Sequence, residues 1–101
     1  MAEERSEDLE IEVFPWDYSV GGNVEHIADH GVTPLDILEV KNHRPRFFVA
    51  RPEHFGYVML GPNRAGRYLY VPLIEVSPGM WRVITAYWLS KRRAERLYFK
   101  E

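Results

Sequence analysis

The sequence predicts an α+β fold with the element order β-α-α-β-β-β-β-α, in which an antiparallel sheet packs with helices. Three observations predict it: two short capped helical patterns at 23–42, alternating segments joined by turns at 46–88, and a capped helical pattern at 91–99. The 101 residues, of which 46% are hydrophobic, can bury one modest core. We therefore expect a single domain at residues 13–101 behind an acidic N-terminal tail at residues 1–12.

The N-terminal part of the domain predicts one strand and one short helix. Residues 11–16 carry four large apolar side chains and predict the first strand. Pro15 places that strand at an edge or ends it early, because proline donates no backbone hydrogen bond. Asn23 is expected to cap a helix at residues 23–30, since its side-chain oxygen can accept a bond from a first-turn N–H. Gly31 is expected to end this helix because glycine takes the left-handed conformation readily.

A second helix is expected at residues 34–42. Thr33 is a favourable N-cap, and Pro34 suits the first helical position, where its missing N–H has no consequence. Asp36 is favourable near the positive end of the helix. Three apolar residues are expected to form the buried side: Leu35, Ile37 and Leu38.

The rest of the chain predicts a meander of strands and a final helix. Strands are expected at residues 46–50, 55–60, 66–73 and 81–88, and the short turns between them imply antiparallel pairing. In the last strand, strict alternation places Arg82, Ile84, Ala86 and Trp88 on one face. Ser90 is expected to cap the helix at residues 91–99, whose inner stripe is formed by three residues: Ala94, Leu97 and Tyr98.

Charge is unevenly distributed along the chain. The net charge is −2, but residues 1–12 contain six acidic side chains against Arg5, while residues 64–101 contain eight basic side chains against three acidic ones. A basic surface of this kind can bind nucleic acid or an acidic partner. A solvated charged helix face is the alternative interpretation.

Several classes of site and of location are not expected. The chain has no cysteine, and His26 and His30, four residues apart on one helix face, lack an evident third ligand, so we expect no metal and no cofactor. No apolar run approaches the roughly 18–20 residues that a membrane span needs, so no membrane partner is expected. The first residues lack the pattern of a secretory signal, which favours a cytoplasmic location.

Four segments carry a resemblance to a known family. The first contains Trp16, Asp17, Asn23 and the run His26 to Val32, written H-x-x-x-H-G-V. The others are G-R-Y-L-Y-V at 66–71, R-V-I-T-A at 82–86, and a terminal helix with K-R-R at 91–93, Glu95 and Tyr98. In order and spacing, these segments resemble BrnT-type toxins of bacterial type II toxin–antitoxin pairs, which are small ribonucleases of the RelE/ParE-like superfamily.

The resemblance implies a fold and a function. It implies a RelE-like fold and a metal-independent ribonuclease that cleaves RNA and inhibits translation until a cognate antitoxin protein binds. It also implies that the toxin–antitoxin complex binds promoter DNA. The chain departs from the family at Tyr87, where typical members carry an arginine. Two alternatives therefore stay open: a RelE-fold binding module without catalysis, and a ParE-like toxin directed at DNA gyrase.

Cleavage of RNA at its 2′-hydroxyl requires a proton acceptor, a group that stabilises the charged phosphorus centre, and a proton donor for the leaving oxygen. The five candidate catalytic residues are Lys91 and Arg93 for charge stabilisation, Arg82 for phosphate contact, and His26 and His30 for proton transfer. Five further residues are expected to bind the substrate through charge or stacking: Arg67, Tyr68, Tyr70, Tyr87 and Arg92.

Overall fold

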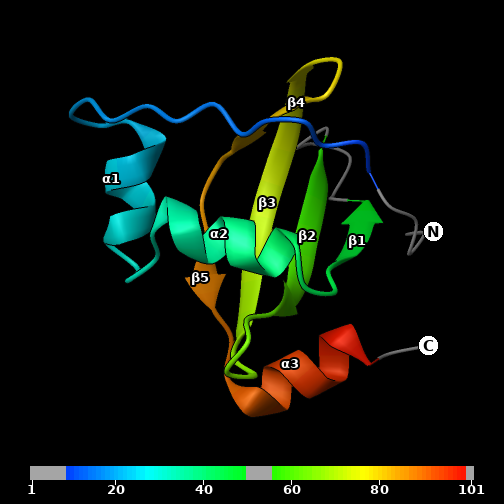
Figure 1. Ribbon diagram of the computed structural model, residues 1–101. Coiled ribbons are helices and arrows are strands. Elements are labelled where there is room, and N and C mark those ends of the chain that lie inside the picture. The colour runs from blue at the N-terminus through cyan, green and yellow to red at the C-terminus, as the bar shows by residue number, and fades with distance from the viewer. Residues whose placement is uncertain (1–8, 50–55, 100–101) are drawn as a thin grey trace.

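The computed structural model of the protein describes residues 9–49 and 56–99 (Figure 1). Residues 1–8 of the expected tail, and residues 50 and 55 at the ends of two expected strands, lie outside this part. The described helices are α1 (Asn23–Ala28), α2 (Pro34–Lys41) and α3 (Lys91–Tyr98). The described strands are β1 (Arg46–Val49), β2 (Tyr57–Pro62), β3 (Tyr68–Ser77), β4 (Met80–Val83) and β5 (Tyr87–Trp88).

The described strands form one antiparallel sheet. The order is β1-β2-β3-β4, and the short β5 also pairs with β3, further along the edge that β4 occupies. The predicted class, α+β with an antiparallel sheet and helices, is therefore confirmed. The element order of the described residues differs from the prediction at the first strand and at the last.

The prediction of a strand at residues 11–16 is wrong. Only Val13 takes part in an isolated parallel bridge, to Met80, in which the Trp81 N–H donates to the Val13 carbonyl at 3.1 Å. Pro15 has no N–H to continue a ladder beyond this bridge. The segment is held by its side chains instead, because Ile11 and Phe14 are buried in the core.

Asn23 does not cap α1 as predicted, because Gly22 occupies the N-cap position and no side chain bonds to the first turn. Asn23 lies inside the helix, is only 5% exposed, and connects three segments. Its Oδ1 accepts from the Asp17 N–H at 2.9 Å, and its Nδ2 donates to the Val83 carbonyl at 3.0 Å. A Cβ on Gly22 would lie 2.4 Å from the Asp17 oxygen, so this close approach requires glycine.

α2 begins as predicted, with a reciprocal capping box. The Thr33 hydroxyl accepts from the Asp36 N–H at 3.2 Å, and the Asp36 carboxylate accepts from the Thr33 N–H at 2.9 Å. The predicted buried side is correct for Ile37 only, since Leu35 and Leu38 are exposed. Val40 is the other buried residue of this helix.

The expected strand at residues 81–88 is interrupted, and its alternation changes phase. β4 pairs Val83 with Leu73, whereas β5 pairs Tyr87 with Tyr70. Between these two pairs, the three residues 84–86 therefore lie opposite only two residues of β3, 71 and 72. An extra residue of this kind is a β-bulge, and it moves the following side chains to the other face. Ala86 consequently packs in the same core cluster as Val83, which contradicts the predicted strict alternation.

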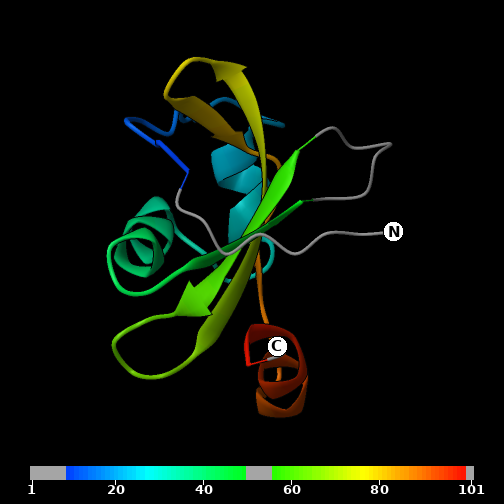
Figure 2. The same ribbon diagram turned by 90° about the vertical axis from the view of Figure 1, so that its right-hand side faces the viewer.

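Each face of the sheet carries its own apolar cluster. On the first face, α1, α2 and the N-terminal segment cover the larger cluster, which includes Ile27, Ile37, Met59, Leu69 and Val71 (Figure 2). On the second face, α3 covers a smaller cluster at the end of the sheet away from the β3–β4 turn (Figures 1 and 2). The remainder of the second face is not covered by any described helix.

Candidate functional site

α3 places a row of cations beside the second face of the sheet. Ser90 caps the helix as predicted, because its hydroxyl accepts from the Arg93 N–H at 3.2 Å. The predicted inner stripe of Ala94, Leu97 and Tyr98 is confirmed, since all three pack in the smaller apolar cluster. This packing leaves the basic side chains of the helix at the surface.

A hollow of about 410 Å³ lies where α3 stops covering the sheet. We call it the tyrosine hollow, because Tyr70 and Tyr87 line it together with Thr85, Arg93 and apolar residues of β2, β3 and the bulge. The described lining contains one cation and no carboxylate. Its volume falls within the range of roughly 300–1,000 Å³ that is usual for small-molecule sites.

The two tyrosine rings of the hollow are stacked on one another. Their centroids are 5.1 Å apart and their planes differ by 22°. The pair arises directly from the register, since Tyr70 and Tyr87 are cross-strand partners of β3 and β5. The bulge at residues 84–86 therefore has a consequence for the site, because it sets the phase that turns Tyr87 to the second face.

The turn after α1 carries His30 to the tyrosine pair, while His26 lies in α1 itself. The Val32 N–H donates to the Ile27 carbonyl at 3.1 Å, and the Gly31 N–H donates to the Ala28 carbonyl at 2.9 Å, with Gly31 at φ +75°. These two bonds form a Schellman motif, and they confirm the prediction that Gly31 ends the helix.

The His30 ring lies beside Tyr87, with centroids 6.0 Å apart, and meets the His26 ring edge to face at 5.8 Å. The Trp88 Nε1–H donates to the Gly31 carbonyl at 3.1 Å, which fixes the turn against β5. His26, His30, Tyr87 and Tyr70 thus form a continuous series of ring contacts.

A second hollow, of about 340 Å³, adjoins the first turn of α3 and contains three more predicted site residues. Arg67, Tyr68 and Lys91 line this α3 hollow, together with Glu95. The Arg67 guanidinium lies 4.4 Å from the ring centroid of Trp88 in a cation–π contact. Burial and, to a smaller degree, the neighbouring Tyr98 raise the pKa of Tyr68.

Two predicted site residues lie apart from both hollows. Arg82 is opposite Ile74 on the exposed side of β4, and Arg92 is exposed on α3. Neither side chain lines the tyrosine hollow or the α3 hollow. The structure therefore brings His26, His30, Tyr70, Tyr87 and Arg93 into one group, and Arg67, Tyr68 and Lys91 into another.

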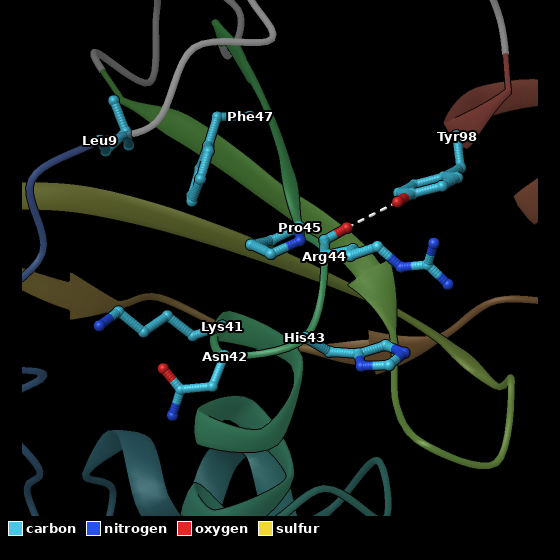
Figure 3. A pocket seen from close by; sticks show the side chains of 8 residues that line it. All are labelled: Leu9, Lys41, Asn42, His43, Arg44, Pro45, Phe47 and Tyr98. Atoms are coloured by element: carbon cyan, nitrogen blue, oxygen red, sulfur yellow. Dashed lines mark hydrogen bonds between the residues drawn. The ribbon is translucent and has the colours of Figure 1, made fainter.

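A third hollow, of about 510 Å³, lies around the connection between α2 and β1 (Figure 3). Lys41, His43 and Arg44 line it, and none of them was predicted as a site residue. The Tyr98 hydroxyl donates to the Arg44 carbonyl at 2.6 Å, so the end of α3 is tied to this connection. The only sequence signal was the basic character of residues 41–46, which alone does not distinguish a site from a solvated surface.

Thr85 is the site residue that sequence reasoning missed. Its Oγ1 atom is buried and has no hydrogen-bond partner, and it is the only such side-chain atom among the described residues. A threonine in an alternating strand gives no signal of this kind, because threonine is a common strand residue.

Metal chemistry has no visible support in residues 9–49 and 56–99. That part of the chain contains no group of three or more His, Cys, Asp or Glu side chains able to hold a metal ion. It also contains no helix long and apolar enough to cross a membrane.

Asp17 forms hydrogen bonds with its neighbour Ser19. The Ser19 hydroxyl and the Ser19 N–H both donate to its carboxylate, and these bonds lower the pKa of Asp17.

The arrangement around the tyrosine hollow can bind a flat ring, neutralise an anion and exchange protons. The tyrosine rings supply a stacking surface and Arg93 supplies the positive charge, while His30, which contacts Tyr87 but does not line the hollow, supplies an imidazole beside it. Comparison of the chain with protein-family models, with curated proteins and with solved structures found no match.

Proposed function

We propose that this protein is the toxin of a type II toxin–antitoxin pair, a metal-independent ribonuclease that acts in the cytoplasm. It cleaves RNA and inhibits translation until a cognate antitoxin covers the site, and the complex of the two binds promoter DNA. The proposal rests on the resemblance to BrnT-type toxins, with which an α+β fold of one antiparallel sheet and three described helices is compatible. The single observation that carries it is the series of contacts that joins His30 of the turn after α1 to Tyr87 of β5 and Tyr70 of β3, with Arg93 of α3 lining the same hollow as the two tyrosines.

The reaction uses the nucleophile that the RNA itself carries. The 2′-oxygen forms a bond to the adjacent phosphorus while the bond from phosphorus to the 5′-oxygen breaks, which leaves a 2′,3′-cyclic phosphate. His30 accepts the proton of the 2′-hydroxyl, with Tyr87 beside it to orient the ribose. Arg93 stabilises the negative charge that develops on the phosphoryl oxygens, and a protonated group or water returns a proton to the 5′-oxygen.

Tyr87 stands where typical members of the family carry an arginine, so the proposal has to assign the positive charge of that arginine to another residue. Tyr87 stacks on Tyr70 and contacts His30, while Arg93 of α3 lines the same hollow. In this proposal Arg93 supplies the positive charge that the substituted arginine would otherwise provide. Lys91 and Arg67 then hold the RNA backbone further along, at the α3 hollow.

The test is incubation of the purified protein with a long RNA in EDTA, beside three variants. We expect discrete cleavage by the wild type and a loss of about 100-fold or more in rate for Arg93→Ala and for His30→Ala. Arg96→Ala is the matched control, because Arg96 is an exposed cation of the same helix that lies outside the tyrosine hollow. Its rate should stay within about twofold of the wild type, since a single exposed charge contributes little.

The other outcomes point to the alternatives. RNA binding without cleavage, also in the presence of translating ribosomes, would favour the binding module. Growth arrest in cells without any RNA cleavage would favour a gyrase-directed toxin. Equal losses in Arg93→Ala and Arg96→Ala would contradict the placement of the site in the tyrosine hollow.

A further inference from the structure

The α3 hollow lies between one face of α3 and the turn that joins β2 to β3. Lys91, Glu95 and Phe99 line it and are spaced four residues apart, so they lie one above another along the helix and its C-cap. Successive members of this row are separated by about one helical turn, or roughly 6 Å along the axis. One wall of the hollow therefore presents a cation, a carboxylate and an aromatic ring in that order.

The opposite wall provides a second cation and a second ring. The Arg67 guanidinium lies 4.4 Å from the ring centroid of Trp88, and this contact helps to hold it in place. The Tyr68 ring meets the Phe99 ring at a centroid distance of 6.1 Å and an angle of 65°. Phe99 is nevertheless 57% exposed, so its ring is available for stacking by a ligand in the hollow.

Glu95 is the only carboxylate in the described lining of the α3 hollow, and it is exposed to solvent. In the part of the chain that the structure describes, its carboxylate is not paired with Lys91 or Arg67, the two cations of the hollow. An ionised carboxylate accepts hydrogen bonds and donates none. A ligand that reaches Glu95 must therefore present donors along its edge.

The groups of the hollow together define the chemistry of that ligand. The two cations favour a phosphate group, and the two aromatic rings favour a flat ring. Among the bases of RNA, guanine presents two neighbouring donors, N1–H and N2–H, which can bond to both oxygens of one carboxylate. Adenine and cytosine carry an acceptor nitrogen beside the amino group, and uracil carries a carbonyl on each side of its N–H, so each of them directs a lone pair at a carboxylate.

We propose that the α3 hollow is a guanine-selecting subsite for single-stranded RNA. One unstacked guanine donates from N1–H and N2–H to the Glu95 carboxylate and packs against the Phe99 ring. Its phosphate lies between Lys91 and Arg67. This inference rests on the proposed function, because it names the base that accompanies the RNA backbone held at this hollow.

The variant Glu95→Gln separates recognition of guanine from general electrostatics. If Glu95 only repelled anions, removing its charge would tighten the binding of every nucleotide. In the proposed subsite, glutamine replaces one acceptor by a donor, so guanine loses one of its two bonds. The same amide can accept from the adenine N6 amino group and donate to adenine N1, so adenine should gain what guanine loses.

The experiment is a titration of the full chain with each of the four ribonucleoside 3′-monophosphates, followed by NMR on the ring signals of Tyr68 and Phe99. We expect guanosine 3′-monophosphate to bind about tenfold more tightly than the other three, which is typical of one bidentate contact. Glu95→Gln should weaken this nucleotide by about threefold to tenfold and tighten adenosine 3′-monophosphate by about twofold or more.

Two further variants complete the design. Phe99→Ala should weaken all four nucleotides by about fivefold and keep the preference, because every base has a ring face that can stack. Glu75→Gln is the matched control, since it makes the same charge change at an exposed residue of β3 outside the hollow. It should leave all four affinities within about twofold of the wild type.

Three results would overturn the subsite: no perturbation of the Tyr68 and Phe99 rings by any nucleotide, no preference for guanine, or a preference that survives Glu95→Gln. A short single-stranded RNA with one guanine should bind at least as tightly as the monophosphate. Weaker binding of the RNA would assign the hollow to a free guanine nucleotide and would also overturn the proposal.

The ribonuclease proposal is judged separately, by cleavage of long RNA. Cleavage without guanine preference would refute the subsite alone, and guanine preference without cleavage would refute the ribonuclease alone.

Discussion

Substitution of Asn23 by aspartate distinguishes a helix cap from a link between distant segments. At an N-cap, asparagine and aspartate are nearly equivalent, so a capping role predicts almost no change in stability. In the structure, however, Asn23 uses both ends of its amide, as an acceptor from the Asp17 N–H and as a donor to the Val83 carbonyl. Asn23→Asp keeps the acceptor, removes the donor, and puts a carboxylate oxygen against a carbonyl oxygen.

The expected loss follows from these contacts. Leaving the Val83 carbonyl unpaired destabilises by about 1–3 kcal/mol, and burying a charge at a side chain that is 5% exposed adds to it. We expect Asn23→Asp to lower the free energy of unfolding by about 2–4 kcal/mol, a large part of the roughly 5–15 kcal/mol typical of a domain.

Urea unfolding followed by circular dichroism measures this change. The comparison requires that the free energy of unfolding falls with urea concentration at the same slope in the wild type and the variant. Asn63→Asp is the matched control, because Asn63 Oδ1 accepts a bond from the Arg67 N–H at 2.8 Å and the substitution keeps this acceptor. The control should stay within about 0.5 kcal/mol of the wild type. A loss below about 0.5 kcal/mol for Asn23→Asp would refute the linking role.

Three further predictions concern local contacts. Gly22→Ala should destabilise by about 1–3 kcal/mol in urea unfolding, because the new Cβ would lie 2.4 Å from the Asp17 oxygen; an unchanged midpoint would contradict the crowding. Ser19→Ala should raise the pKa of Asp17 toward 3.8 in an NMR titration of the carboxyl carbon. Because the folded pKa is lowered, the associated stability is present above pH 3.8 and is lost as the pH falls through the folded value, so the two proteins should converge in acid. Tyr98→Phe removes the 2.6 Å bond to the Arg44 carbonyl and should lower stability by about 0.5–1.5 kcal/mol; equal stability would show that water replaces this bond.

Local signals in the sequence predicted the parts of the fold that depend on local contacts. The Thr33 and Ser90 caps and the Gly31 stop involve residues within five positions of one another, and all three are confirmed. The partner of Asn23 is Val83, 60 positions away, so its role could not be inferred from neighbouring residues. The first strand was wrong for the same reason, since apolar alternation does not show whether a strand finds a pairing edge.

The candidate site was predictable in its residue types and less so in its grouping. The basic and aromatic C-terminal third was visible in the sequence, and so was the shared face of His26 and His30. The separation of Arg82 from Arg93 depends on register, and the buried state of the Thr85 hydroxyl depends on the bulge. These are properties of strand pairing, which a single sequence specifies only weakly.

The bulge at residues 84–86 restricts the kinds of sequence change that this segment tolerates over evolution. Its extra residue keeps Trp88 on the side of the core cluster and Tyr87 in the tyrosine hollow. Inserting or deleting one residue would exchange these two side chains between core and surface, whereas a substitution alters one position and leaves the others in place. Descendants of this chain should therefore vary in residue type along this segment while keeping its length constant.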